Sequence, residues 1–253
     1  MTTRSAPLYA GCRFPVEVIS YAIYLYYRFS LSLRMAEEML ALRGDTVSHE
    51  TIRAWALKFG QVIANRIRQC RLARGNWWHL DEVVLRIAGK KHYLWRAVDQ
   101  DGFVLDVLVQ SRRNKRAAKR LLRKLLTKQG RAPRVLITDK LRFYAAAKKN
   151  LTLRCEHRQY KGLNNRAENS HQPTRRRERQ MKRYKSPKQV QRFLAIHDPI
   201  ANLFYLHRDN RTVAEYRTAR GQAFQAWAEM AGARLAVKTD PHLRACAMCP
   251  TSA

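Results

Sequence analysis

The first quarter of the chain carries apolar residues at the spacing of α-helices. A first helix is predicted to begin at Pro15, because proline suits the first helical position and an apolar face then recurs every three or four residues. The positions of that face are Val18, Ala22, Leu25 and Phe29. A second helix is expected at about 31–42. A third helix, capped by Ser48, is predicted to end at Gly60.

Three short helices with a glycine-containing turn are typical of a helix-turn-helix domain. An ordinary three-helix packing unit would show the same pattern. In the DNA-binding interpretation, the third helix enters a major groove and its first turn meets base edges. The residues expected to contact DNA from this helix are Ser48, His49, Arg53 and Lys58. Residues 61–74 are predicted to continue as an amphipathic helix or linker.

From Trp77 the pattern changes from helical spacing to alternation. The stretch WWHLDEVVLRI predicts a strand in which Asp81, Val83, Leu85 and Ile87 share one face. Turns at residues 88–90 and 99–102 separate it from two more apolar stretches, HYLWRAV and FVLDVLVQ. The pattern therefore predicts an antiparallel meander of three strands.

A helix over residues 114–130 follows, and then a short buried strand, VLIT, which ends at Asp139. A helical segment, AAAKK, and a possible fifth strand, LTLRCEH, precede a long basic helical region that reaches about residue 207. The order β-β-β-α-β-α-β-α is the one found in ribonuclease-H-like domains. The predicted fold class is thus α/β, with a ribonuclease-H-like mixed sheet preceded by a small all-α domain.

This pattern divides the chain into four predicted parts. Residues 1–13 form a flexible N-terminus, and residues 14–74 form the helix-turn-helix domain and linker helix. Residues 75–207 form the ribonuclease-H-like domain. Residues 208–253 hold a C-terminal helix, in AEYRTARGQAFQAWAEMAG, and a tail.

The charge of the chain narrows the classes of partner. It has 253 residues, with 50 Lys and Arg against 19 Asp and Glu, a formal net charge of +31 and a pI near 10.8. Its 46% hydrophobic residues are enough for a folded core. So large an excess of cations favours a nucleic acid partner, because binding to phosphates releases counterions. A membrane surface and a purely structural RNA-binding role are the weaker alternatives.

Other sequence features favour a reducing cytoplasm. No signal peptide is recognisable, and the most apolar early stretch, residues 18–27, is too short to span a bilayer. The five cysteines are scattered and odd in number, which argues against a disulfide framework. Cys246 and Cys249, with His242, offer three zinc ligands, but without a second pair a simple tail is the preferred interpretation.

Acidic residues are scarce, so their positions are informative. Asp81 lies in the first strand and Asp139 ends the buried strand, and in this fold order those two strands are neighbours. Two close carboxylates repel one another, and a divalent cation such as Mg²⁺ removes the conflict. A third carboxylate from the following helix, at Glu168, would complete a site for two ions that clamp the oxygens of a phosphodiester displacement.

Each of these acids also has a structural interpretation. Asp81 could be a buried partner of an arginine, and Asp139 could cap a helix. Glu168 could complete a capping box with Asn165. Among the other acids, four have simpler roles. Glu82 is expected on the opposite strand face from Asp81, Asp99 and Asp101 in a turn, and Glu178 beside its arginine neighbours.

A strongly basic helical stretch follows Glu168. Pro173 is expected to bend or split it, giving segments at 164–172 and 173–183. The second segment is interpreted as a track for DNA phosphates, although a solvated basic helix has the same composition. The residues of the track are Arg175, Arg176, Arg177, Arg179, Lys182 and Arg183. His171, three residues after Glu168, is expected to touch the scissile phosphate, to transfer a proton, or simply to form a hydrogen bond.

Three stretches together resemble the bacterial insertion-sequence transposases of the Asp-Asp-Glu (DDE) type, in the group around insertion sequence six. They are WWHLDEVVLRIAGKKHYLWRAVDQDGFVLDVLVQSRRN, VLITDK and EHRQYKGLNNRAENSHQPTRRRER. The resemblance covers about residues 14–207. It implies that Asp81, Asp139 and Glu168 are the catalytic residues and the metal ligands.

The resemblance also implies a reaction and its partners. The protein would catalyse metal-dependent DNA strand cleavage and strand transfer, with two Mg²⁺ or Mn²⁺ ions when DNA is bound. Its partners would be double-stranded DNA, as terminal inverted repeats and target DNA, and further copies of itself in a homodimer or higher oligomer. It would act in the bacterial cytoplasm, at the nucleoid, without a membrane partner.

One feature departs from the pattern of this group. Only 28 residues separate Asp139 from Glu168, fewer than in many of its members, and this bears on the assignment of Glu168. The alternative function is a non-catalytic DNA-binding protein or repressor with a degenerate nuclease-like domain. A nuclease that only cleaves is the third hypothesis.

Overall fold

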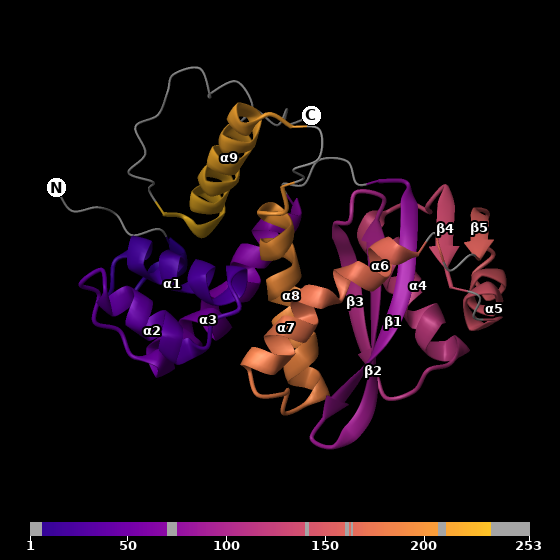
Figure 1. Cartoon of the computed structure of the whole chain (residues 1–253), viewed down its shortest axis with the longest axis horizontal. Helices are drawn as coiled ribbons and strands as arrows, with labels where there is room; N and C mark the ends of the chain where they lie inside the picture. The colour runs from indigo at the N-terminus through magenta and orange to yellow at the C-terminus, as the bar shows by residue number, and fades with distance from the viewer. Residues whose placement is uncertain are drawn as a thin grey trace.

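A five-stranded sheet lies beside a group of helices that come from both ends of the chain (Figure 1). This computed structural model describes residues 7–69, 75–139, 142–159, 162, 164–206 and 211–233. The suggested zinc ligands at 242, 246 and 249 lie outside the described residues.

The predicted N-terminal helices are present, with shifted ends. After a short 3-10 turn, η1 (Pro7–Tyr9), they are α1 (Val16–Arg28), α2 (Leu33–Ala41) and α3 (His49–Gln69). Pro15 is the N-cap of α1 and not its first residue. The predicted break at Gly60 is wrong, because α3 continues without interruption to Gln69, so the helix predicted as one alternative for residues 61–74 is part of α3 as far as the structure describes it. Gly60 instead permits close packing, since a Cβ there would lie 3.1 Å from Ile196 and 3.2 Å from Tyr27.

The sheet has the order β3-β2-β1-β4-β5. Its strands are β1 (Trp77–Ile87), β2 (Lys90–Asp99), β3 (Val104–Gln110), β4 (Val135–Thr138) and β5 (Glu156–Gln159). β1 pairs antiparallel with β2, and β2 with β3, whereas β4 runs parallel to both β1 and β5. The predicted ribonuclease-H-like order is therefore confirmed. The fifth strand begins at Glu156, later than predicted, because Leu151–Leu153 form a turn that bonds back to the preceding helix.

Two helices connect the strands on one face of the sheet, α4 (Lys115–Gln129) and α5 (Arg142–Asn150). The ends of α4 follow the sequence closely. The Asn114 side chain accepts the Ala117 N–H, and Gly130 ends the helix in the left-handed conformation that glycine tolerates. Between these helices and the sheet lies an apolar core that includes Trp78, Trp95 and Leu121.

The opposite face of the sheet packs against α8 (Pro187–Leu203), which runs between the sheet and the N-terminal helices (Figure 1). A second core joins Leu85 and Leu94 of the sheet to α8, to α1–α3 and to α9 (Val213–Ala231), the predicted C-terminal helix. This core therefore contains residues from both sides of the predicted domain boundaries at 74/75 and 207/208. No helix among the described residues is both long and apolar enough to cross a membrane.

The basic stretch is split as predicted. It forms α6 (Asn165–Ser170) and α7 (Gln172–Gln180), which meet at His171, and Pro173 lies in the first turn of α7. Proline is tolerated there because the first helical N–H groups have no partner within the helix.

Candidate active site

Asp81 and Asp139 come from adjacent parallel strands. The last β1–β4 partners are Leu80 and Thr138, so the two aspartates directly follow that pair at the carboxyl end of β4. Their side chains are 16% and 25% exposed. Such an edge of an α/β sheet is where ligands bind, and both carboxylates are accessible there.

The helix that carries Glu168 is fixed to this edge at both ends. Before its first turn, the buried Asn164 amide donates a hydrogen bond to the Leu80 carbonyl of β1 at 3.0 Å. At its last residue, Arg96 of β2 donates to the Ser170 carbonyl at 2.6 Å. The backbone next to Asp81 therefore holds α6 directly, which places the helix at the aspartates despite the short connection from Asp139.

The capping-box interpretation of Glu168 is wrong. The N-cap of α6 is Asn164 and not Asn165, and no side chain caps the helix. Glu168 is exposed, and among the described residues its carboxylate has no hydrogen-bonding or ion-pair partner. The structure thus leaves this carboxylate available to a ligand.

Glu168 and Asp81 line one hollow of about 450 Å³, termed the Asp81 groove. Its other lining residues are Val83, His171, Gln172, Arg175, Arg176 and Arg179. Asp139 is not in this lining, and Arg113 Nη2 lies 3.8 Å from its Oδ2 atom. Within the described residues, no three His, Cys, Asp or Glu side chains lie close enough together to hold a metal ion.

His171 is a buried neighbour of Asp81. Its ring is about 5% exposed and its Nε2 atom lies 3.2 Å from Asp81 Oδ2. Burial lowers the pKa of His171 to about 4, against the opposing effect of Asp81, so the ring is neutral at neutral pH. His171 also lines the Asp81 groove, so its contact with a scissile phosphate stays a prediction. Its closeness to Asp81 is also compatible with a role in orienting that carboxylate.

One residue of the predicted phosphate track, Arg177, is buried. Arg177 is only 1% exposed, because its guanidinium donates to the carbonyls of Phe29 and Leu31 and stacks over Tyr26. Its inclusion among the DNA contacts is therefore wrong, and Arg177 instead joins α7 to the α1–α2 turn. The other five cations of the track are exposed.

Two of the four predicted DNA contacts at α3 have acidic partners near the start of the helix. His49 Nδ1 lies 3.0 Å from Glu37, and Arg53 lies 3.0 Å from Glu50. Ser48 caps the helix by accepting the Thr51 N–H at 3.3 Å. His49 and Arg53 line a hollow of about 900 Å³ that is shared with the turn between α7 and α8. Besides Arg53, the cations that line this hollow are Arg34, Lys182, Lys185, Lys188 and Arg192. Lys58 lies over the Phe59 ring, 5.2 Å from its centre.

Sequence reasoning missed two buried clusters beside the site. In the first, Glu82 accepts a hydrogen bond from Arg113 Nε at 2.6 Å and one from the Tyr144 hydroxyl at 2.5 Å. Burial raises the pKa of Glu82 to about 7, although Tyr144 and Arg113 oppose the shift. The alternation along β1 placed Glu82 opposite Asp81, but nothing in the sequence pointed to Arg113, which links Glu82 to Asp139.

In the second cluster, Arg96 and Asp198 form a buried ion pair at 3.4 Å, with side chains 1% and 5% exposed. Arg96 also donates to the Thr174 hydroxyl of α7 at 2.7 Å. Burial alone would raise the pKa of Asp198, but Arg96 and His197 hold it below its ordinary value. This pair ties β2, α7 and α8 together, and Arg96 is the β2 residue that pairs with Asp81 in the sheet.

The fold and the site define a class of protein. A ribonuclease-H-like sheet with one aspartate within its first strand and one at the end of the adjacent parallel strand, beside a helix that carries a glutamate, is the arrangement of DDE-type catalytic domains. A family model described as a DDE domain, DDE_Tnp_IS240, matches residues 75–207, over half of the chain. The chain therefore belongs to this family, and the resemblance to insertion-sequence transposases of the DDE type is confirmed.

Two curated relatives come from Staphylococcus aureus. They are the transposase for insertion sequence-like element IS431mec and the transposase for insertion sequence element IS257 in transposon Tn4003. Each is 31% identical over 127 residues, which is 50% of this chain and 56% of the relative. The matched region thus spans about half the length of these relatives.

Among solved structures, the chain is similar to the HTLV-2 integrase catalytic core domain in complex with magnesium. The TM-score is 0.38 at 16% identity, covering 55% of this chain and 93% of that one. It is also similar to the catalytic core domain of BIV integrase, with a TM-score of 0.36 at 14% identity, covering 60% of this chain and 99% of that one.

Proposed function

We propose that this protein is a transposase that cleaves DNA at the ends of an insertion sequence and joins them to target DNA. The observation that carries the proposal is that Asp81 and Asp139 directly follow the last residue pair between the adjacent strands β1 and β4, with Glu168 lining the same groove as Asp81. The family membership of residues 75–207 supports the same reaction class.

The donor chemistry of the site fits a divalent metal. Asp81, Asp139 and Glu168 offer partly or fully exposed carboxylate oxygens, which Mg²⁺ and Mn²⁺ prefer as ligands. These three residues would hold the metal, up to two ions with DNA bound, once binding draws them closer together than they lie here. Divalent ions in such a site supply the positive charge that stabilises the attacking and leaving oxygens of a phosphodiester displacement.

The remaining residues of the site would bind and orient the substrate. Arg175, Arg176 and Arg179 line the Asp81 groove and would hold phosphates there through charge-assisted hydrogen bonds. His171 would keep Asp81 in position, since its neutral ring lies 3.2 Å from that carboxylate. Accurate placement of the reacting groups is a large part of the catalysis expected for such a displacement.

The N-terminal helices would recognise the DNA ends. The first turn of α3 and cations from the α7–α8 turn line the same hollow, so a duplex held there would touch both regions. Terminal inverted repeats and target DNA are the proposed partners. Because two ends must be joined in one reaction, we propose a homodimer or larger oligomer as the active form.

The proposed function can be tested by reacting the purified full chain with labelled DNA ends and a plasmid target in the presence of Mg²⁺ or Mn²⁺. The expected products are DNA cut at the element boundary and the same ends joined to plasmid. Cut DNA without joining would identify a nuclease. Specific binding without any cut product would favour the repressor alternative. Either outcome would overturn the proposal.

Replacing Arg53 with Ala should weaken binding to terminal-repeat DNA more than binding to random DNA. Loss of a base contact typically costs about 1–3 kcal/mol of discrimination, so a roughly tenfold selective loss is expected. Fluorescence anisotropy with both DNAs measures it. Arg217→Ala, an exposed cation on α9, is the matched control. Equal losses on both DNAs would show that Arg53 contacts only phosphate.

A further inference from the structure

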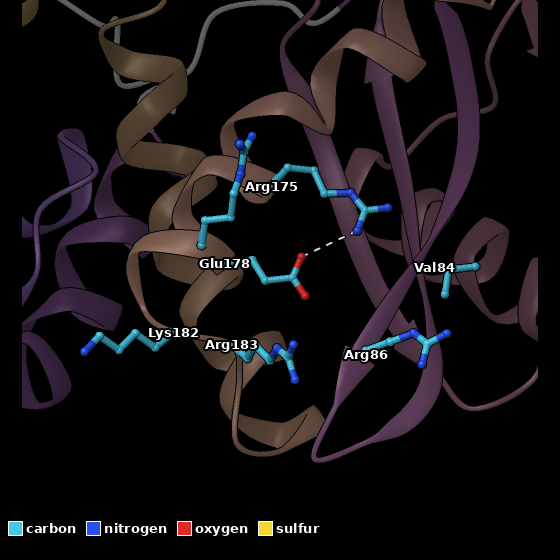
Figure 2. Close-up of a pocket in the computed structure, with 7 residues that line it drawn as sticks. Val84, Arg86, Arg175, Glu178, Lys182 and Arg183 are labelled. Atoms are coloured by element: carbon cyan, nitrogen blue, oxygen red, sulfur yellow. Dashed lines mark hydrogen bonds and ion pairs between the residues drawn. The ribbon is translucent and has the colours of Figure 1, made fainter.

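A second hollow continues from the Asp81 groove along α7. It has a volume of about 640 Å³, and Figure 2 shows the side chains that line it. One wall is β1, with Val84 and Arg86, and the other is α7 and its C-terminal turn. The lining residues of that second wall are Arg175, Glu178, Arg179, Lys182 and Arg183. Arg175 and Arg179 also line the Asp81 groove, so the two hollows adjoin at these two side chains.

The β1 wall is open because its neighbouring strand ends early. β4 pairs with β1 only as far as Leu80, so residues 81–87 have no partner strand on that side among the described strands. Arg86 is exposed on this stretch and lies directly across the hairpin from Lys91. Like charges at such paired positions destabilise a hairpin. A polyanion bound beside Arg86 would relieve that repulsion.

The α7 wall gathers cations at a turn with unusual backbone geometry. Lys182 and Arg183 have φ values of +50° and +76°, a left-handed conformation that non-glycine residues rarely adopt. The Arg183 N–H donates to the Glu178 carbonyl at 2.9 Å, which closes the turn. The turn sets two cations at the far end of the hollow from Asp81.

One acid interrupts this cationic lining. The Glu178 side chain is 14% exposed and lies 3.5 Å from Arg175, toward which it points in Figure 2. The lining thus has five cations, Arg86, Arg175, Arg179, Lys182 and Arg183, and a single carboxylate. Glu178 therefore partly neutralises Arg175, which lines both hollows.

We propose that this β1–α7 groove binds the sugar-phosphate backbone of one DNA strand on one side of the cleavage position. Arg86 of β1 and the cations of α7 contact the phosphates from opposite walls. Glu178 is the counter-ion of Arg175 in the free protein, and a DNA phosphate replaces its carboxylate beside Arg175 when DNA binds. The inference rests on the proposed function, because it takes the carboxylates of the Asp81 groove as the cleavage position.

The test measures binding of DNA ends to the full chain at several salt concentrations by fluorescence anisotropy. Arg86→Ala should reduce the slope of log K against log[salt] by about 0.7–0.9, the value for one lost phosphate contact. Lys90→Ala, an exposed cation of the same hairpin that does not line the groove, should change the slope less. Glu178→Gln should tighten binding, and Glu229→Gln on α9 is its control for charge.

The DNA substrates separate this groove from general electrostatics. Each variant is measured on a full substrate and on two shorter ones that end at the cleavage position, one lacking each side. The effects of Arg86→Ala and Glu178→Gln should vanish on one of the shortened substrates. Effects that persist on both, or that match those of the two controls, would overturn the inference.

The inference and the proposed function can fail separately. If the wild-type chain cuts and joins DNA ends while Arg86→Ala binds with an unchanged slope, only the β1–α7 groove is wrong. If the wild-type chain makes no product, the proposed function fails whatever the slopes show.

Discussion

Replacement of Asp139 by Asn is expected to abolish DNA cleavage and joining while DNA-end binding remains. The change keeps the size of the side chain but removes the negative charge that a divalent ion needs next to Asp81. Metal ions in such sites supply several kcal/mol of transition-state stabilisation, so a rate decrease on the order of 10³-fold or more is expected. The measurement is a single-turnover cleavage and joining assay beside a binding titration.

The binding titration separates catalysis from folding. Asp139 is not part of the proposed DNA-recognition surfaces on α3 and α7, so the Kd for DNA ends should stay within about twofold of wild type, less than 0.5 kcal/mol. Asp101→Asn, in an exposed turn, is the matched control and should retain activity. Chelation of divalent ions should give the same loss of activity in the wild-type chain. An active Asp139→Asn variant would remove this residue from the catalytic site.

Replacement of Asp198 by Ala is expected to cause the largest loss of folding stability. It would leave the Arg96 guanidinium charged and buried, with side-chain exposure of only 1%, and without its carboxylate partner. Breaking a buried ion pair in this way typically costs about 3–5 kcal/mol. Denaturant unfolding followed by circular dichroism measures the loss as a lower midpoint.

A second variant tests whether the unpaired charge is the cause. Arg96→Met combined with Asp198→Leu removes both charges and fills similar volume, so it should recover much of the lost stability. It would not restore the bonds from Arg96 to Ser170 and Thr174, so activity should remain low when stability returns. If Asp198→Ala unfolds at the wild-type midpoint, the buried pair does not stabilise the fold.

Much of the fold can be predicted from the sequence, because the local patterns that define its strands and helix ends are strong. The period-2 alternation that starts at Trp77 and the turns at residues 88–90 and 99–102 define the meander without reference to the rest of the chain. Asn114 and Gly130 marked the ends of α4, because a side-chain cap and a left-handed residue are local needs. Asp139 was located by its place after a short, fully buried strand.

Other features depended on contacts that are distant in sequence. By sequence, Gly60 is predicted to end a helix. In the structure α3 continues through it, because α1 and α8 pack closely against the helix at Gly60. By sequence, Arg177 is indistinguishable from the exposed cations of the same helix. In the structure, carbonyls of the α1–α2 turn and the Tyr26 ring surround its guanidinium. Asn165 and Glu168 have the spacing of a capping box, yet the helix begins one residue earlier, where Asn164 is held by β1.

The sequence alone determined the order of strands and helices, one aspartate within the first strand and one after the short buried strand, and the excess of cations, since each follows from local periodicity or from composition. Only the tertiary structure decided that Glu168 faces the same groove as Asp81. That placement results from hydrogen bonds from Asn164 to β1 and from Arg96 to Ser170, which join residues 84 and 74 positions apart. Local propensity cannot predict such hydrogen bonds, because the two partners meet only after the sheet and α6 have formed.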